Sequence, residues 1–383
     1  MEYQLSELFD LQMGKTPDRN NPSYWNNNKN KWISIADLSK SGKYIIDTKE
    51  TISNSAVISS GIKPIPPNTV VMSFKLSIGK TAITKEQIYS NEAIMAFIDK
   101  KIVQINPSYL YYLLANKKWD QGSNKAVMGI TLNKASLSQY KVNIPNIHIQ
   151  NNVVTKLDKL TQLIETQKKQ MIVLDNLIKS RFVEMFGDPE INPKNWEQVT
   201  VKDVCSSIVR GPFGSMLKKE FFVEKGKNTY KVYEQKNAIQ KNAFIGTYYV
   251  DSKKFTELKR FECISGDILM SCSGTMGKLY QLPTNCEKGL INQALCKFTL
   301  NSKILPVVFL TYMNETIGKL ETKGSGIKNI AAVSYVKAMP INIPPIELQY
   351  QFADFVEQVN KSKFIADLIR TLMEMIDSNC FPN

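Results

Sequence analysis

The sequence predicts an α+β protein with two similar mixed α/β domains, two long coiled-coil helices between them, and an internal repeat. The first observation behind this prediction is that short segments of the first half return in the second half. The recurring pairs, 198 or 199 residues apart, are Val70–Ser73 with Ile268–Ser271, Gly79-Lys80 with Gly277-Lys278, and Val142–Pro145 with Ile341–Pro344. The second observation is a helical period of apolar residues after each copy of the last segment. Solenoid repeats run only ~20–50 residues, so the long spacing indicates a duplicated domain-plus-helix module.

The first domain is predicted over residues 1–147, as short strands separated by turns. Trp32–Ile35 and Thr69–Phe74 have the apolar character of strands. Clusters of proline and asparagine between such runs mark turns and loops. Pro107–Leu114 predicts a helix, because proline is favoured in the first helical turn. We expect the domain to end in a strand closed by Pro145.

A long helix is predicted over residues 148–188. Its apolar positions alternate three and four residues apart, with Gln167 as the one polar position, and such a seam is typical of a coiled coil. The residues expected to pack in this seam are Leu157, Leu160, Ile164, Met171, Leu174 and Ile178. Gly187-Asp188-Pro189 then ends the helix, and residues 189–195 form a linker.

A second domain and a second helix repeat this order over residues 196–346 and 347–383. The second seam contains Phe352, Phe355, Val359, Ala366, Ile369, Met373 and Ile376, with Ser362 as its polar position. An isolated amphipathic helix of this length would leave a long apolar stripe in water. We therefore expect the two helices to pack against each other.

Composition excludes several classes of protein. No apolar run reaches the ~18–20 residues that a membrane helix needs. The N-terminus lacks the basic start and the apolar stretch of a signal peptide, so we expect a cytoplasmic protein without a membrane partner. The six cysteines form no C-x-x-C pair and His148 is the one histidine, so no metal site is predicted.

The net charge of +14 is concentrated in the two domains. Residues 1–146 carry a net charge of +7 and residues 196–345 a net charge of +9. The helical stretch 147–195 carries +1 and the tail 346–383 carries −3. A basic excess confined to two globular domains predicts a polyanion that is bound at two places.

The sequence contains no recognisable catalytic motif. Gly79-Lys80-Thr81 and Gly14-Lys15-Thr16 end like the phosphate-binding loop (Walker A motif) of nucleoside triphosphatases. However, Phe74 and Phe9 stand where that motif requires its first glycine. A single histidine also leaves little for a nucleophile–base pair. We therefore predict a protein that is not itself an enzyme and that binds no cofactor.

Polar, basic, glycine-containing loops recur at matching places in the two domains. Lysine, serine and backbone N–H groups suit phosphates, arginine suits base edges, and glycine lets a backbone approach closely. The candidate DNA-binding residues of the first domain are Lys15, Thr16, Lys75, Lys80, Lys117, Lys118 and Lys125. Those of the second domain are Arg210, Ser215, Lys218, Ser273, Lys278, Lys323, Ser325 and Lys328.

The junctions between domain and helix carry a family resemblance. Asn143–Gln150 reads Asn-Ile-Pro-Asn-Ile-His-Ile-Gln, and Asn342–Gln349 reads Asn-Ile-Pro-Pro-Ile-Glu-Leu-Gln. With Ser180–Pro189 and the duplication, they make the whole chain resemble the specificity (S) subunit of type I restriction–modification enzymes. In that family, such segments lead from a target recognition domain into a conserved helix. Asn146 and His148 of the first junction depart from the family's second proline and acidic residue.

The resemblance implies two target recognition domains, each reading one half of a bipartite, asymmetric site in double-stranded DNA. It implies that the two helices pack antiparallel as a spacer, which gives pseudo-two-fold symmetry. It also implies two methyltransferase (M) subunits that methylate adenine with S-adenosylmethionine, and restriction (R) subunits that use ATP and Mg²⁺. Such a complex serves in defence against foreign DNA.

Two other functions stay open at this point. A free-standing DNA-binding regulator would use the same domains without methyltransferase partners. The recognition part of a fused methyltransferase–nuclease would need catalytic motifs that this sequence does not contain.

Overall fold

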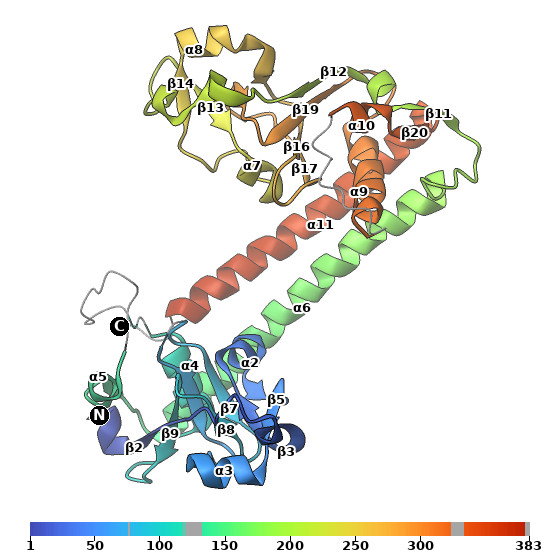
Figure 1. Ribbon diagram of the computed structural model, residues 1–383. Coiled ribbons are helices and arrows are strands. Elements are labelled where there is room, and N and C mark those ends of the chain that lie inside the picture. The colour runs from blue at the N-terminus through green and yellow to red at the C-terminus, as the bar shows by residue number, and fades with distance from the viewer. Residues whose placement is uncertain (76, 118, 120–131, 323–332, 380–383) are drawn as a thin grey trace. The chain divides into compact units, whose positions relative to one another are not determined.

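The computed structural model describes residues 1–75, 77–117, 119, 132–322 and 333–379 (Figure 1). It divides into two compact units, Met1–Lys168 with Asp367–Asn383, and Lys169–Ala366. Each of the two long helices is therefore divided, with one part in each unit. The two units are described separately below.

The first unit contains the chain before helix α6, here called the first head. Its strands form a five-stranded sheet in the order β2-β9-β6-β7-β4, a three-stranded sheet β5-β3-β8, and the pair β1-β10. The strands are β1 Glu2–Gln4, β2 Phe9–Met13, β3 Trp25–Ile33, β4 Tyr44–Ile45, β5 Glu50–Ile52, β6 Val70–Ser73, β7 Thr81–Thr84, β8 Tyr89–Ser90, β9 Ile94–Asp99 and β10 Lys141–Asn143. The helices are α1 Leu5–Leu8, η1 Pro22–Tyr24, α2 Ile35–Lys40, α3 Asn54–Ser60, α4 Pro107–Ala115 and α5 Lys134–Ser138.

The elements of the first head follow the sequence signals closely. Strands β6 and β7 are buried along their whole length, as expected for a sheet covered on both faces. Helix α4 begins at Pro107 as predicted, and Asn106 caps it by accepting the N–H of Ser108. The predicted strand Trp32–Ile35 ends two residues earlier, at Ile33. The reason is a capping box at Ser34, whose side chain and N–H exchange hydrogen bonds with Asp37 to start α2.

The second unit contains the second head, the chain between the linker and helix α11. Its sheets have the orders β12-β19-β16-β17, β14-β13-β18-β15 and β11-β20. The strands are β11 Glu197–Thr200, β12 Cys205–Arg210, β13 Thr229–Tyr233, β14 Tyr249–Asp251, β15 Glu262–Cys263, β16 Ile268–Ser271, β17 Leu279–Gln281, β18 Gly289–Ile291, β19 Leu295–Leu300 and β20 Pro340–Ile343. The helices are η2 Val201–Val204, η3 Gly214–Leu217, η4 Lys219–Phe221, α7 Gln235–Ile239, α8 Ser252–Glu257, η5 Lys259–Phe261, α9 Pro306–Thr322 and α10 Val333–Ala338.

The two heads share the order and pairing of their main strands, which confirms the internal repeat. The order β2-β9-β6-β7 of the first head matches β12-β19-β16-β17 of the second. In both heads an inner strand of another sheet pairs parallel with a later one, β3 with β8 and β13 with β18. The first and last strands of each head also pair antiparallel, β1 with β10 and β11 with β20.

Each head is joined to its long helix by a buried glutamine in the first helical turn. Gln150 accepts the N–H of Asn106 at 2.8 Å and donates to the carbonyls of Gln104 and Pro145. Gln349 makes the same three bonds in the second unit, with the N–H of Leu305 and the carbonyls of Lys303 and Pro344. We call each of these sets of bonds a glutamine clamp.

Helix α6 covers Ile147–Phe186, and its first part packs on the first head. Leu157 is fully buried in the core of that head and Leu160 packs against the same core. The Asp158 carboxylate accepts from Lys43 Nζ at 2.5 Å and from the Tyr112 hydroxyl at 2.6 Å. Leu157 and Leu160, which we predicted for the helix pair, therefore hold the helix to the head instead.

In the second unit, the end of α6 packs against the start of helix α11, Ile346–Asn379. The ring centroids of Phe182 and Phe352 lie 5.5 Å apart. About one turn and three turns further along α11, Arg181 lies over Phe355, and Lys363 Nζ lies 2.6 Å from the Asp175 carboxylate. Residue numbers fall along α6 as they rise along α11, so the predicted antiparallel packing is confirmed for these parts of the helices.

The seam of the helix pair differs from the prediction in detail. Ser362 is exposed, and the polar seam position is taken by Lys363, so the predicted register was wrong there. Phe352, Val359 and Ala366 are buried as predicted, whereas Ile369 is exposed at the surface. The half-buried predicted residues are Ile164, Met171, Leu174, Ile178 and Phe355. The side chains of Met373 and Ile376 lie outside the described residues.

Candidate nucleic-acid interface

Each head presents a loop of the same construction between two neighbouring strands, β6 and β7 in the first head and β16 and β17 in the second. In the first head, Ser73 Oγ donates to the carbonyl of Ser77 at 2.5 Å and accepts the N–H of Lys80 at 3.1 Å. In the second head, Ser271 Oγ makes the same bonds to Thr275 at 2.7 Å and to Lys278 at 2.9 Å. Lys80 and Lys278 are both exposed at the end of these loops. The two heads therefore carry a lysine, Lys80 or Lys278, at the same place on the same hydrogen-bonded frame, and we call residues 73–80 and 271–278 the lysine hairpins.

A glycine follows strand β2 in the first head and strand β12 in the second, and its backbone crosses close to the neighbouring chain. The N–H of Gly14 donates to Ile94 and the N–H of Gly211 donates to Leu295. A Cβ atom at Gly14 would lie 2.1 Å from the Ser90 carbonyl oxygen. At Gly211 it would lie 1.9 Å from the carbonyl oxygen of Asn292. Only glycine fits either crossing, and the crossing fixes the path of the basic residues beside it.

In the first head, the predicted residues Lys15, Thr16 and Lys75 gather around Glu92. The Thr16 hydroxyl donates a hydrogen bond to the Glu92 carboxylate. This bond lowers the pKa of Glu92, and the positive charges of Lys75 and Arg19 lower it further. Lys15 Nζ donates to the carbonyl of Ser60 at 3.2 Å. Lys15, Thr16 and Glu92 line an open depression of about 610 Å³ beside strand β2.

The predicted Lys117 lies near the first lysine hairpin. Its Nζ is 5.3 Å from the centre of the Tyr140 ring, and Trp119 packs on that ring at 4.8 Å. Trp119 in turn lies 3.0 Å from the position of a Cβ atom at Gly79, within the hairpin. Lys118 and Lys125 lie outside the described residues.

In the second head, Arg210 ends strand β12 directly before the glycine crossing. Its Nε donates to the carbonyl of Gln293 at 3.4 Å, and its guanidinium lies 5.2 Å from the centre of the Phe213 ring. A hydrogen bond from Cys296 lowers the pKa of Cys272, and the nearby Arg210 lowers it further. Strand β19 lies between Arg210 and the second lysine hairpin, because Cys296 pairs with Arg210 on one side and with Met270, directly before the hairpin, on the other.

The other predicted residues of the second head lie on short exposed segments. Ser215 lies in η3, and Lys218 follows it and pairs with Glu220 at 3.6 Å. Ser273 is exposed at the tip of the lysine hairpin, where the neighbouring Gly274 lies against Gln235. Lys323, Ser325 and Lys328 lie outside the described residues.

Comparison with known protein families gives an independent assignment of this duplicated fold. The family model described as type I restriction modification DNA specificity domain matches residues 1–174 and again residues 193–372. The chain belongs to this family. Each copy of the specificity domain thus contains one head and the greater part of the helix that follows it.

Two curated relatives of this chain are similar over part of their length. The type I restriction enzyme MjaIX specificity subunit of Methanocaldococcus jannaschii is 27% identical over 294 residues, 76% of this chain and 64% of the relative. The EcoR124I/EcoR124II specificity subunit of Escherichia coli is 27% identical over 167 residues, 42% of this chain and 40% of the relative. The chain therefore matches less than two thirds of the length of either relative.

The fold of this chain is also that of a solved structure. One chain from a structural study of complex assembly and conformational transition of the type I R-M system matches with a TM-score of 0.64. The match covers 99% of this chain and 96% of that chain, at 14% sequence identity. At this identity, the similarity establishes the shared fold.

The specificity fold brings to these surfaces several residues that we did not predict from sequence. Arg19 and Glu92 lie beside the predicted Lys15 and Thr16 in the first head. In the second head, Gln235 lies beside the lysine hairpin and Gln293 lies beside Arg210. The pattern of basic, glycine-containing loops does not single them out, although amide, arginine and carboxylate side chains can all read base edges.

Two general features are visible in the described part of the chain. No helix there combines the length and the apolar character needed to span a membrane. No group of three or more His, Cys, Asp or Glu side chains there is placed to hold a metal ion.

We expect the substitution Gly211→Ala to lower the free energy of unfolding by about 1–3 kcal/mol, because the added methyl group overlaps a backbone oxygen. Relief of this overlap should displace the backbone at residue 211, move Arg210 and weaken DNA binding. Urea unfolding and DNA titration of the full chain measure the two effects. Gly226→Ala is the matched control, since its Cβ would meet only the Thr229 methyl group at 3.8 Å. Equal stability of the two variants would contradict the close crossing.

Proposed function

We propose that this chain is the specificity subunit of a type I restriction–modification complex. In this function each head reads one half of a bipartite, asymmetric site in double-stranded DNA. The chain itself is a non-catalytic recognition subunit. It works in the cytoplasm, where a complex that defends against foreign DNA meets its target.

The observation that carries the proposal is the pair of lysine hairpins. Two heads of one topology hold the same exposed lysine on the same hydrogen-bonded frame, at Lys80 and at Lys278. The side chains around the two frames differ, with Thr16 and Glu92 in one head and Arg210 and Gln293 in the other. A common phosphate contact with different neighbours suits a site whose two halves have different sequences.

The proposal includes partner subunits that supply the chemistry. Two M subunits would bind S-adenosylmethionine and methylate adenine in the recognised site. R subunits would bind ATP and Mg²⁺ and cut the DNA. The antiparallel helices would set the distance between the half-sites, and the chain itself would bind no cofactor.

The test of the proposed function is the pattern of adenine methylation in cells. The full chain is expressed together with its M subunits, and methylated adenines are mapped by sequencing. We expect a split motif that depends on this chain. A chimera that carries a second specificity subunit's sequence in place of the second head should change one half of the motif. Specific DNA binding without new methylation would favour the free-standing regulator instead.

The lysine hairpins make a further prediction about salt dependence. Lys278→Ala should weaken binding to all DNA sequences alike, because a phosphate contact carries no sequence information. The slope of log K against log salt should fall by about 0.9, the value for one phosphate contact. Titrations at several salt concentrations measure it, with Lys253→Ala on helix α8 as the control for loss of one surface charge. A changed sequence preference at an unchanged slope would make Lys278 a base-reading residue.

A further inference from the structure

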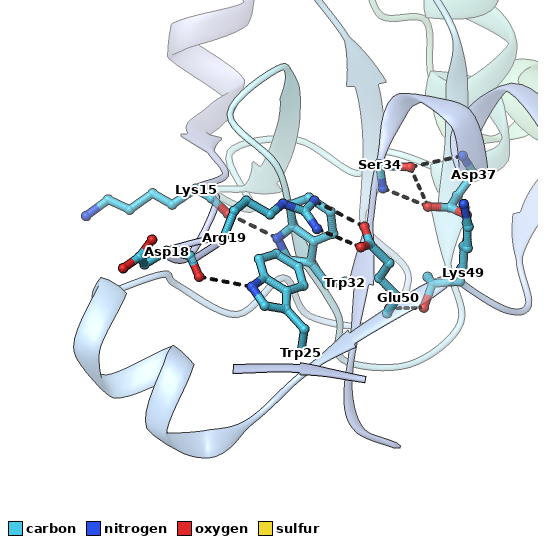
Figure 2. A network of polar contacts seen from close by, with 10 residues as sticks. Lys15, Asp18, Arg19, Trp25, Trp32, Ser34, Asp37, Lys49 and Glu50 are labelled. Carbon is cyan, nitrogen blue, oxygen red and sulfur yellow. Dashed lines mark hydrogen bonds and ion pairs between the residues drawn. The ribbon is translucent and has the colours of Figure 1, made fainter. Parts of the chain in front are cut away.

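A cluster of two tryptophans, an arginine and a glutamate lies beside the predicted contact residues of the first head (Figure 2). The Arg19 guanidinium lies 3.7 Å from the centre of the Trp25 ring and 4.9 Å from that of Trp32. Its Nη1 and Nη2 atoms donate to the two carboxylate oxygens of Glu50 at 2.6 and 3.1 Å. The planar group is therefore held by a ring on its face and a carboxylate at its edge.

The same two tryptophans hold the backbone of the contact segment. Trp32 Nε1 donates to the carbonyl of Lys15 at 3.1 Å, and Trp25 Nε1 donates to the carbonyl of Asp18 at 3.0 Å. Figure 2 shows both indoles turned toward this segment. The chain between the glycine crossing and Arg19 is thus fixed at three points, and Arg19 belongs to the same rigid surface as Lys15.

The contribution of the Arg19–Glu50 ion pair to stability does not explain why the Arg19 side chain is held in one position. Its side chain is 49% exposed and that of Glu50 is 26% exposed. An ion pair at this degree of exposure contributes little to stability after the side-chain entropy is subtracted. A guanidinium has five N–H donors, and the bonds to Glu50 use two of them. Donors thus remain for an outside ligand, on a side chain that is already ordered.

The neighbourhood of Arg19 is where DNA is expected under the proposed function. The Thr16 hydroxyl donates a hydrogen bond to the Glu92 carboxylate, and the positive charges of Lys75 and Arg19 also lower the pKa of Glu92. Lysines of this surface are flexible point charges that suit phosphates, whereas a fixed planar fork suits a base edge. In the major groove, guanine presents two acceptors, O6 and N7, to such a fork.

The second head has different chemistry at the corresponding place. Strand β3 lies between β5 and β8 as β13 lies between β14 and β18. By the register of these strands, Trp32 corresponds to Val232 and Glu50 to Tyr248. There Tyr248 stacks on Phe222 at 4.5 Å. The cluster is therefore particular to one head, as expected of a residue that reads one half-site.

We propose that Arg19 is a specificity-determining residue that contacts O6 and N7 of a guanine in the half-site read by the first head. Trp25, Trp32 and Glu50 are its positioning residues. This proposal rests on the proposed function, because it needs the first head to lie in the major groove of DNA.

The test begins with selection of DNA sites from a random duplex library by the full chain assembled with its M subunits. Arg19→Lys keeps the charge and loses the planar fork. We expect it to lose about tenfold in preference for guanine at one position of one half-site and to leave the other half-site unchanged. Lys15→Ala is the matched control from the same segment, and it should lower affinity for all sequences and keep the motif.

A second arm uses the wild-type chain and so does not depend on the folding of a variant. In the selected site, each guanine is replaced in turn by 7-deazaguanine, which lacks the N7 acceptor and still pairs with cytosine. We expect one replacement to weaken binding by the wild type about tenfold and to have little effect on Arg19→Lys.

The outcomes separate the two proposals. A wild-type chain that selects no motif overturns the proposed function and the role of Arg19 with it. A bipartite motif in which no guanine responds to 7-deazaguanine overturns the role of Arg19 alone. If Arg19→Lys keeps the motif and only lowers affinity, Arg19 contacts phosphate or supports the fold, and the proposal is wrong.

Discussion

Replacing Phe352 by alanine is expected to lower the free energy of unfolding of the second unit by about 3–5 kcal/mol. Phe352 is fully buried where α11 meets α6, and its ring centroid lies 5.5 Å from that of Phe182 and 5.4 Å from that of Phe186. These three rings pack with the core of the second head. The substitution would therefore leave a cavity where both helices and the head meet, and the surrounding elements could not all close it.

Urea unfolding of the full chain, followed by circular dichroism, measures this loss. Phe364→Ala on the same helix is the matched control, because the Phe364 side chain is 71% exposed. Its effect should stay within about 0.5 kcal/mol, as for most surface substitutions. If both variants unfolded at the same urea concentration, the antiparallel packing of the helix ends would have to be revised.

Replacing Gln349 by leucine is expected to cost about 2–4 kcal/mol, although leucine is more apolar and similar in size. The glutamine clamp satisfies one buried N–H, that of Leu305 at 2.8 Å, and the carbonyls of Lys303 and Pro344. Leucine would leave these backbone groups without partners. A buried polar group that loses its partner costs far more than the hydrogen bond contributes on balance.

The neighbouring Gln351 gives the control for this prediction, since it is exposed on the same helical turn. Gln351→Leu should change the unfolding free energy little. Gln150→Leu should repeat the loss in the first unit. A Gln349→Leu variant as stable as wild type would mean that water or a shift of the helix replaces the three bonds.

Much of the architecture was predictable because the chain repeats its own signals. The matching of Val70–Ser73 with Ile268–Ser271 predicted two equivalent central strands, and both form with the same neighbours. The junction segments around Gln150 and Gln349 marked both helix starts. Such features depend on local sequence and appear twice, so each copy supports the interpretation of the other.

The parts that sequence reasoning missed depend on contacts between distant residues. The helix seam shifted from Ser362 to Lys363 because the aromatic cluster around Phe352 fixes the rotation of α11, and heptad spacing alone does not include it. Arg19 was missed because its partners, Trp32 and Glu50, come from strands β3 and β5. The DNA-binding residues named from sequence stay a prediction, since their role depends on a ligand.

The glutamine clamp forms hydrogen bonds only with backbone atoms. At Gln150 and Gln349 alike, the bonded groups are one N–H and two carbonyls, and every residue type at the carbonyl positions would offer the same atoms. A head of another sequence that follows the same backbone path would be held as firmly. The attachment of a head to its helix through the clamp therefore does not depend on the side chains that would read DNA, and the two can evolve independently. Under the proposed function, one recombination event that exchanges a whole head would change the target without any change at the clamp itself.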